Sequence, residues 1–216
     1  MLLLMAIVGM TANAQNEIGQ LTLQPKIGLN LANLTEVEVV TNPFTNETES
    51  GKLKGDFVIG AEAEYGLTDK ISVAAGILYS RQGADFGTYK LYGNPDGSVS
   101  DGWDKYQCQL SYLNIPIVAN YYFSKGWAVK VGIQPGFLLS AKQKVDGLGY
   151  RESEDTDIKN IHKTFDFSIP FGISYEKNNW VFDGRYNLGL TKVNKEGDKN
   201  SKNSVIQFTV GYKFSL

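Results

Sequence analysis

The feature that most constrains the fold of this chain is an alternation of apolar and polar residues with a period of two. It is clearest in the last segment, residues 205–216, with the sequence VIQFTVGYKFSL. Its apolar parity is formed by Ile206, Phe208, Val210, Tyr212, Phe214 and Leu216. Side chains of a β-strand point alternately to opposite faces, so this period predicts a strand with one apolar face. Either another sheet or lipid has to cover that face.

The same alternation recurs along the whole chain. We expect seven earlier strands, at about residues 21–31, 56–67, 71–80, 108–123, 127–139, 165–176 and 180–190. Short turns at 68–70, 124–126 and 177–179 alternate with long polar loops at 32–54, 82–105, 142–163 and 192–203. An even strand number with alternating short and long connections is typical of outer-membrane barrels, in which short turns face the periplasm. We therefore expect the four long loops to be extracellular and call their end of the barrel the outer end. The predicted fold is therefore all-β, an eight-stranded antiparallel up-and-down transmembrane β-barrel.

One strand departs from a simple pattern. Cys108, Leu110 and Tyr112 lie on the opposite parity from Leu113 and the apolar residues that follow it. This shift predicts a β-bulge near Tyr112.

The polar parity carries most of the strand glycines together with charges of both signs. Small residues suit the narrow interior of an eight-stranded barrel, whereas the many aromatic residues of the apolar parity would crowd it. Buried charges need partners, so we predict an ion-pair network in the lumen, in which Arg185 pairs with Glu62, Glu64 or Asp183. Its members are Lys26, Glu62, Glu64, Lys130, Asp183, Arg185 and Lys213. The alternative is a solvated outer face on a soluble barrel.

Aromatic residues flank the three short turns. Tyr and Trp favour the boundary between membrane and water, which predicts an aromatic girdle rather than the alternative of core aromatics. Its members are Tyr65, Tyr121, Phe123, Trp127, Tyr175 and Trp180. Tyr122 is on the inward parity and is not included.

The first 14 residues, MLLLMAIVGMTANA, form an apolar run that ends in an A-x-A cleavage pattern. We expect a signal peptide at 1–14 and a barrel domain at 15–216. The alternative is a buried N-terminal strand or helix. The net charge of −2 includes no basic block, so no nucleic-acid partner is expected, and the single cysteine, Cys108, excludes an internal disulfide.

Four stretches give the chain a family resemblance: ANAQ at 12–15, YLNIPIVANYYF at 112–123, GIQPGFLLSAK at 132–142 and the terminal GYKFSL. With these, the chain resembles the small outer-membrane β-barrel proteins of Bacteroidetes, often called porin-family proteins. The resemblance implies location in the outer membrane, contact with its lipid and lipopolysaccharide, and recognition by the barrel assembly machinery. It also implies an assembly signal at Phe208, Tyr212, Phe214 and Leu216, although the usual signal ends on an aromatic residue and this chain ends on Leu216. We expect a monomer.

Catalytic and metal-binding patterns are weak. His162 is the only histidine and lacks an accompanying nucleophile motif such as G-x-S-x-G, so no catalytic residue is assigned. One His and one Cys make a zinc site improbable. Segment 94–104 lacks the closing Glu of a calcium loop, and the acidic run 152–157 is expected to be solvated, so no metal or cofactor is predicted. We expect a non-enzymatic barrel for envelope structure or surface interaction; the alternatives are a narrow channel and a lipid-acting enzyme.

Overall fold

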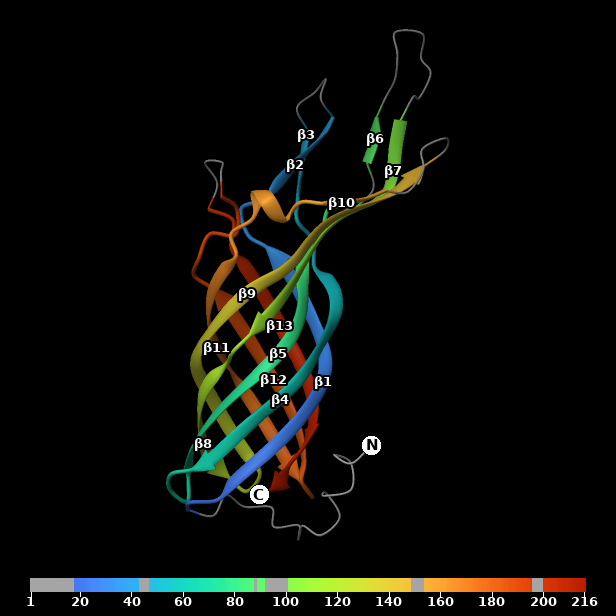
Figure 1. Cartoon of the computed structure of the whole chain (residues 1–216). Helices are drawn as coiled ribbons and strands as arrows, with labels where there is room; N and C mark the ends of the chain where they lie inside the picture. The colour runs from blue at the N-terminus through green and yellow to red at the C-terminus, as the bar shows by residue number, and fades with distance from the viewer. Residues whose placement is uncertain (1–17, 43–46, 88, 92–100, 149–153, 196–199) are drawn as a thin grey trace, which may run out of the picture.

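The computed structural model describes residues 18–42, 47–87, 89–91, 101–148, 154–195 and 200–216. Figure 1 shows a tall barrel of tilted strands with extensions at one end. No helix in those ranges is both long enough and apolar enough to span a bilayer. The predicted signal peptide, 1–14, lies outside the described residues. The strands of the barrel are β1 (Leu21–Leu34), β4 (Lys54–Gly66), β5 (Ile71–Asp85), β7 (Asp101–Asn114), β8 (Ile117–Ser124), β9 (Trp127–Leu148), β11 (Phe165–Lys177), β12 (Trp180–Gly189), β13 (Asn203–Tyr212) and β14 (Phe214–Ser215).

These strands form a closed, antiparallel, eight-stranded barrel, which confirms the predicted fold. Two pairs of labelled strands each form one physical strand. Strands β7 and β8 pair with β5 in one continuous register, interrupted where Pro116 has no N–H to donate. At the end of the chain, β13 and β14 both pair with β1 and close the cycle. The three short turns lie where the sequence predicts them.

The long connections differ from the prediction, because three of them contain strand structure. Loop 32–54 holds a hairpin of β2 (Glu38–Asn42) and β3 (Glu47–Ser50). Loop 82–105 holds the end of β5, β6 (Tyr89–Leu91) and the start of β7, and loop 142–163 holds the end of β9, β10 (Glu154–Asp157) and the 3-10 helix η1 (Lys159–Ile161). In the sequence these segments are rich in polar residues, which is why they were predicted as loops.

The predicted bulge near Tyr112 is present, but its extra residue belongs to the neighbouring strand. Ser111 pairs with Ser140 and Tyr112 pairs with Leu138, which leaves Leu139 as the additional residue in β9. The parity of β7 is therefore unbroken. Cys108, Leu110 and Tyr112 are not out of register; they point into the barrel.

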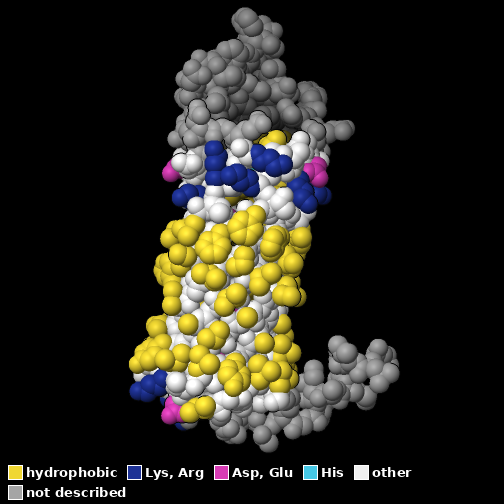
Figure 2. All heavy atoms as spheres, turned by 60° about the vertical axis from the view of Figure 1, so that its left-hand side comes forward, with side chains coloured by type: hydrophobic (Ala, Val, Ile, Leu, Met, Phe, Trp, Pro, Cys, Tyr) yellow, Lys and Arg dark blue, Asp and Glu magenta, His cyan; other side chains and the backbone are white. Residues whose placement is uncertain are grey.

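The outer wall of the barrel is an apolar band (Figure 2). Ile27, Ile77 and Val131, from three different strands, are each 58% exposed. A water-soluble monomer rarely exposes a continuous apolar patch larger than a few hundred Å². In a bilayer the same band faces lipid, and the closed sheet leaves no strand edge in hydrocarbon.

Glycines on the inward parity do more than leave space in the lumen. A Cβ atom on Gly28 would lie 1.9 Å from the carbonyl oxygen of Phe208, and one on Gly132 would lie 2.1 Å from that of Ile117. Both positions therefore need glycine because the backbone of the neighbouring strand lies too close for any side chain.

The outward orientation of the apolar residues of β1 can be tested by placing an arginine at two depths on this strand. Ile27 lies midway along β1, whereas Leu21 lies at its turn end. We expect Ile27→Arg to lower the free energy of unfolding in lipid vesicles by about 2–4 kcal/mol and Leu21→Arg by about 0–1 kcal/mol, because the cost of a lipid-facing cation depends on depth. Urea titration of vesicle-embedded protein measures both. Equal losses at the two positions would contradict this placement of the band.

Candidate functional site: a layered lumen

Five inward side chains form a connected group that we call the central charge layer: Lys26, Glu62, Lys130, Asp183 and Arg185. Arg185 donates from Nη1 to Glu62 Oε1 at 3.0 Å and from Nε to Asp183 Oδ1 at 2.8 Å. Lys26 Nζ lies 2.7 Å from Glu62 Oε2, and Lys130 Nζ lies 2.5 Å from Asp183 Oδ2. All five side chains are buried. Each carboxylate thus bonds to Arg185 and to one lysine.

Four strands supply this layer. Asp183 and Arg185 are two residues apart on β12, so their side chains share the inward face, while Gly184 between them faces outward. Lys26, Glu62 and Lys130 come from β1, β4 and β9. The layer holds three cations and two carboxylates. Charges removed from water are tolerated only when they are paired and hydrogen-bonded. Because the partners lie on different strands, these ion pairs connect the strands across the lumen.

A second group, the turn-end layer, is formed by Glu64, Ser72, Tyr122, Glu176 and Lys213. The ammonium of Lys213 lies 3.0 Å from Glu64 Oε2 and 2.6 Å from Glu176 Oε2. The hydroxyls of Ser72 and Tyr122 donate to Glu64 Oε1 at 2.5 and 2.7 Å. Of the three partners predicted for Arg185, the structure pairs it with Glu62 and Asp183, whereas Glu64 bonds to Lys213. Glu176 and Tyr122 were absent from the predicted network, although their inward parity was a usable signal.

Between the central charge layer and the long connections, the lumen becomes more apolar. Buried apolar side chains cluster at the end beside the long connections, next to buried polar residues such as Gln82 and Asn203. We call this cluster the apolar plug: Leu34, Ala84, Phe86, Cys108, Leu110, Tyr112, Leu138, Ala141 and Val193. Leu110 is 0% exposed and Tyr112 is 1% exposed. The sequence predicts a packed polar lumen, and the structure adds this apolar cluster to it. The signal for the plug was present in the sequence as the inward parity of Cys108, Leu110 and Tyr112.

The predicted girdle residues lie on the outer wall beside the short turns. Five of them are exposed: Tyr65, Tyr121, Phe123, Trp127 and Trp180. Tyr175 is half-buried because its ring stacks on Trp127, with the ring centroids 4.8 Å apart. Tyr122, by contrast, is inside the lumen. Further aromatic pairs stand at the other end of the band, such as Phe137 with Phe165 at 5.8 Å.

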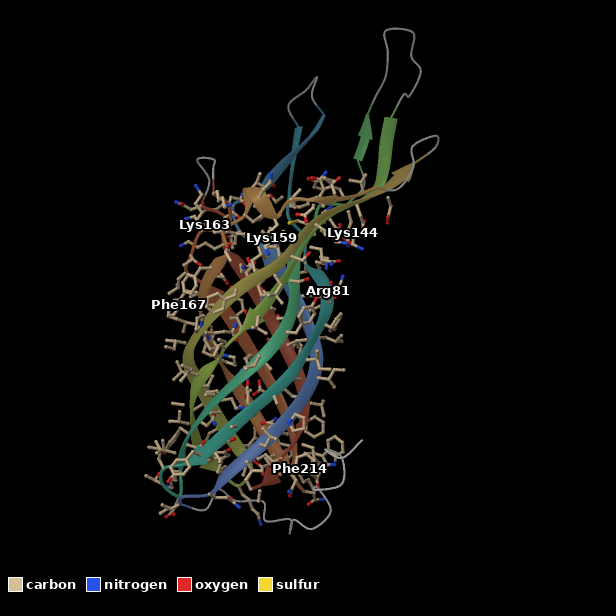
Figure 3. The ribbon with its side chains drawn as sticks, in the orientation of Figure 1. Arg81, Lys144, Lys159, Lys163, Phe167 and Phe214 are labelled. Atoms are coloured by element: carbon tan, nitrogen blue, oxygen red, sulfur yellow. The ribbon has the colours of Figure 1, made fainter. Side chains whose placement is uncertain are left out.

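The four residues of the predicted assembly signal share the outward face of the last strands. Phe208 is 54% exposed and Leu216 is 66% exposed. The ring of Tyr212 contacts those of Trp180 and Phe214, with centroid distances of 5.3 and 4.9 Å. Figure 3 shows Phe214 at the turn end of the barrel. Their recognition by the assembly machinery stays a prediction.

His162 is not arranged for catalysis. Its side chain is buried, and Nδ1 lies 2.8 Å from the carbonyl oxygen of Ile158, so Nδ1 carries the proton and donates it. Desolvation is the main cause that lowers the pKa of His162, and the positive charge of Lys195 lowers it further. Among the described residues, no three His, Cys, Asp or Glu side chains are placed to hold a metal ion. Segment 94–104 lies outside the described residues except where β7 begins.

The two charge layers predict different costs for removing a carboxylate. Glu62→Gln leaves three cations facing Asp183 alone, so we expect a loss of about 3–5 kcal/mol in the free energy of unfolding. Glu176→Gln, the matched change, leaves Lys213 paired with Glu64, and we expect a clearly smaller loss. Urea unfolding in vesicles compares the two variants. A loss at Glu176→Gln as large as at Glu62→Gln would contradict the layered arrangement.

Comparison with known proteins places this geometry among outer-membrane barrels. The family model described as outer membrane protein beta-barrel domain matches residues 13–195. No curated protein matches the chain. Among solved structures, the chain is similar to the attachment invasion locus protein Ail of Yersinia pestis, with 14% identity, a TM-score of 0.50, and coverage of 92% of this chain and 100% of that one.

Two other solved structures show lower scores. Neisserial surface protein A has 17% identity, a TM-score of 0.46, and coverage of 90% of this chain and 97% of that one. OprG of Pseudomonas aeruginosa has 10% identity, a TM-score of 0.44, and coverage of 94% and 98%. The narrower grouping with proteins of Bacteroidetes stays a prediction. The family match covers most of the chain and agrees with the closed barrel and its apolar band; this chain belongs to the outer membrane protein beta-barrel domain family and is an outer-membrane β-barrel.

Proposed function

We propose that this protein is a non-enzymatic, closed outer-membrane barrel that does not conduct and that holds a surface structure outside the membrane. The observation that carries the proposal is the stacking of three different layers along one lumen. The turn-end layer, the central charge layer and the apolar plug follow one another from the short turns to the long connections.

The three layers would oppose a passing solute in different ways. An eight-stranded barrel has an interior just wide enough for its own side chains. In the central charge layer, a solute would have to displace ion pairs that hold each other out of water. In the apolar plug, an ion or a polar solute would lose its hydration among mostly apolar side chains. These barriers lie in series, so opening one would not open the lumen.

The extensions at the outer end support a role at the cell surface. Three strand pairs extend from the barrel at the end opposite the short turns: β2 with β3, β6 with β7, and β9 with β10 (Figure 1). Strand β9 is 22 residues long and continues from the barrel into this region. A barrel that seals its own lumen would serve these extensions as a rigid anchor. Because closure satisfies every strand within one chain, we propose a monomer, inserted by the barrel assembly machinery through the aromatic face of its last strand.

Electrical recording tests the closed lumen directly. We expect purified, folded protein in a planar bilayer to give no steady conductance, whereas a large porin added to the same bilayer gives stable steps. Gel migration of an unboiled sample verifies that the barrel is folded. Stable steps from the unmodified barrel would refute the proposal in favour of a narrow channel.

The single cysteine provides a second test in the native sequence. Cys108 is 7% exposed and lies in the apolar plug. We expect a water-soluble maleimide to leave Cys108 unmodified in the folded barrel and to label it after denaturation. The control is the variant Cys108→Ser/Lys163→Cys, whose thiol stands on the exposed rim and reacts in the folded state. Rapid labelling of Cys108 in the folded barrel would show that water passes the plug.

A further inference from the structure

One buried carboxylate of the lumen has no cationic partner. Asp166 is on the inward face of β11, close to the outer end of that strand, and is 6% exposed. Its Oδ1 accepts a hydrogen bond from the Thr191 hydroxyl at 2.7 Å, and this hydroxyl accepts one from the Phe167 amide at 2.8 Å. Figure 3 labels Phe167, the next residue along β11.

The groups that act on the Asp166 carboxylate are neutral. They are the Thr191 hydroxyl, the Asn203 side chain and the Phe167 amide. Within the described part of the chain, no Lys, Arg or His forms an ion pair with Asp166. A buried carboxylate is costly unless a positive charge lies beside it. Asp166 therefore needs a partner that the protein itself does not supply.

A glycine on the neighbouring strand brings two polar side chains next to this carboxylate. Asp166 pairs with Gly136 of β9, and Gly136 pairs in turn with Asn114 of β7. A Cβ atom on Gly136 would lie 2.5 Å from Asn114 Oδ1 and 3.6 Å from the ring of Tyr112. These two side chains thus cover the inward face of Gly136. The charge of Asp166 acts on the Tyr112 hydroxyl, which confirms that the two groups are close.

Polar atoms around Asp166 lack hydrogen-bond partners. They are the Tyr112 hydroxyl, the Asn114 amide nitrogen and both amide atoms of Asn203. All three side chains are buried. The Asn203 amide, from β13, is close to both Asp166 and Tyr112, yet it forms a hydrogen bond of ordinary geometry with neither. Because buried polar groups are nearly always hydrogen-bonded, unpartnered groups from two strands beside one carboxylate indicate a ligand.

The chemistry of these groups restricts the ligand to a small cation. Hydroxyl, amide and carboxylate oxygens are the ligands that hard cations prefer, and a side-chain amide can turn its oxygen toward an ion. The carboxylate disfavours an anion. A single negative charge is balanced by one positive charge, and no group of three His, Cys, Asp or Glu side chains suited to a metal ion occurs among the described residues. Tyr112 is part of the apolar plug, which leaves little room for an organic cation.

We propose that this oxygen-rich cluster holds one monovalent metal cation, such as sodium or potassium, beside the apolar plug. The cluster consists of Tyr112, Asn114, Asp166 and Asn203. The ion would neutralise the buried carboxylate and give the unpartnered oxygens a common partner. This site does not rest on the proposed function, because a cation bound beside the plug is compatible with a closed or an open lumen.

The site also connects the barrel wall to the segment that follows β12. Thr191 lies at the start of this segment and bonds directly to the carboxylate. The same segment contributes Val193 to the plug, and the Val193 amide donates to the carbonyl of Ser201 at 2.8 Å. A cation at Asp166 would therefore stabilise both the outer end of the barrel and the segment that covers it.

Urea unfolding of the full-length protein in zwitterionic vesicles tests the proposal. The buffers contain sodium, potassium, rubidium or N-methylglucamine chloride at one ionic strength. We expect a higher urea midpoint with the metal ions than with N-methylglucamine, and a gain of about 1.4 kcal/mol for each tenfold rise in metal concentration above Kd. Asp166→Asn keeps the shape of the side chain but should remove this dependence. The matched control, Asp157→Asn, alters an exposed carboxylate at the same end and should retain it.

Diffraction from the unmodified protein locates the ion and does not require any variant to fold. Crystals grown in rubidium chloride should show an anomalous peak beside the Asp166 carboxylate. Equal midpoints in all four salts would overturn the proposal and indicate that Asp166 is protonated. A metal-ion effect that persists in Asp166→Asn would also overturn it, as would a rubidium map with no anomalous peak at this position, which would indicate ordered water only.

Discussion

Inside a bilayer no water is available to the backbone, so every strand in the hydrocarbon needs a hydrogen-bonded neighbour on each side. The pairing of β1 with β13 and β14 meets this requirement by joining the two ends of the sheet. Much else in the molecule depends on that closure. The number of strands fixes the width of the lumen, and the width decides which side chains can fill it. At Gly28 the strands approach so closely that only glycine fits.

The narrow lumen contains both charged and apolar side chains, at different heights along its axis. Arg185 connects Glu62 to Asp183, and a lysine on the far side of each carboxylate completes the central charge layer. Toward the outer end, Leu110 and Tyr112 replace charges with packed apolar contacts. In the central charge layer each carboxylate is paired with two cations, which offsets the cost of burying it. The lumen is thus a second core, built from the strand faces that a soluble barrel would expose.

The sequence predicts the eight strands, their turns and their two faces because lipid on one side and a packed lumen on the other impose a period of two. Beyond the bilayer no lipid imposes this period, so β6, β10 and the far end of β9 were not predicted. Parity assigns a side chain to a face but not to a neighbour across the barrel. Glu62 and Glu64 therefore look equivalent in sequence, yet they belong to different layers. Leu110 was interpreted as part of a register shift because its parity is opposite to that of the apolar residues that follow it, whereas it points into the lumen.

The two charge layers carry opposite excess charge. The central layer has one cation more than its carboxylates, whereas around Lys213 the carboxylates Glu64 and Glu176 outnumber the single cation. Fixed charges of opposite sign, stacked along an axis, form a bipolar junction. A cation entering from the short turns would be attracted by the first layer and repelled by the second, and an anion would be repelled at the entrance. These two layers therefore form a dipole along the barrel axis whose negative end faces the short turns.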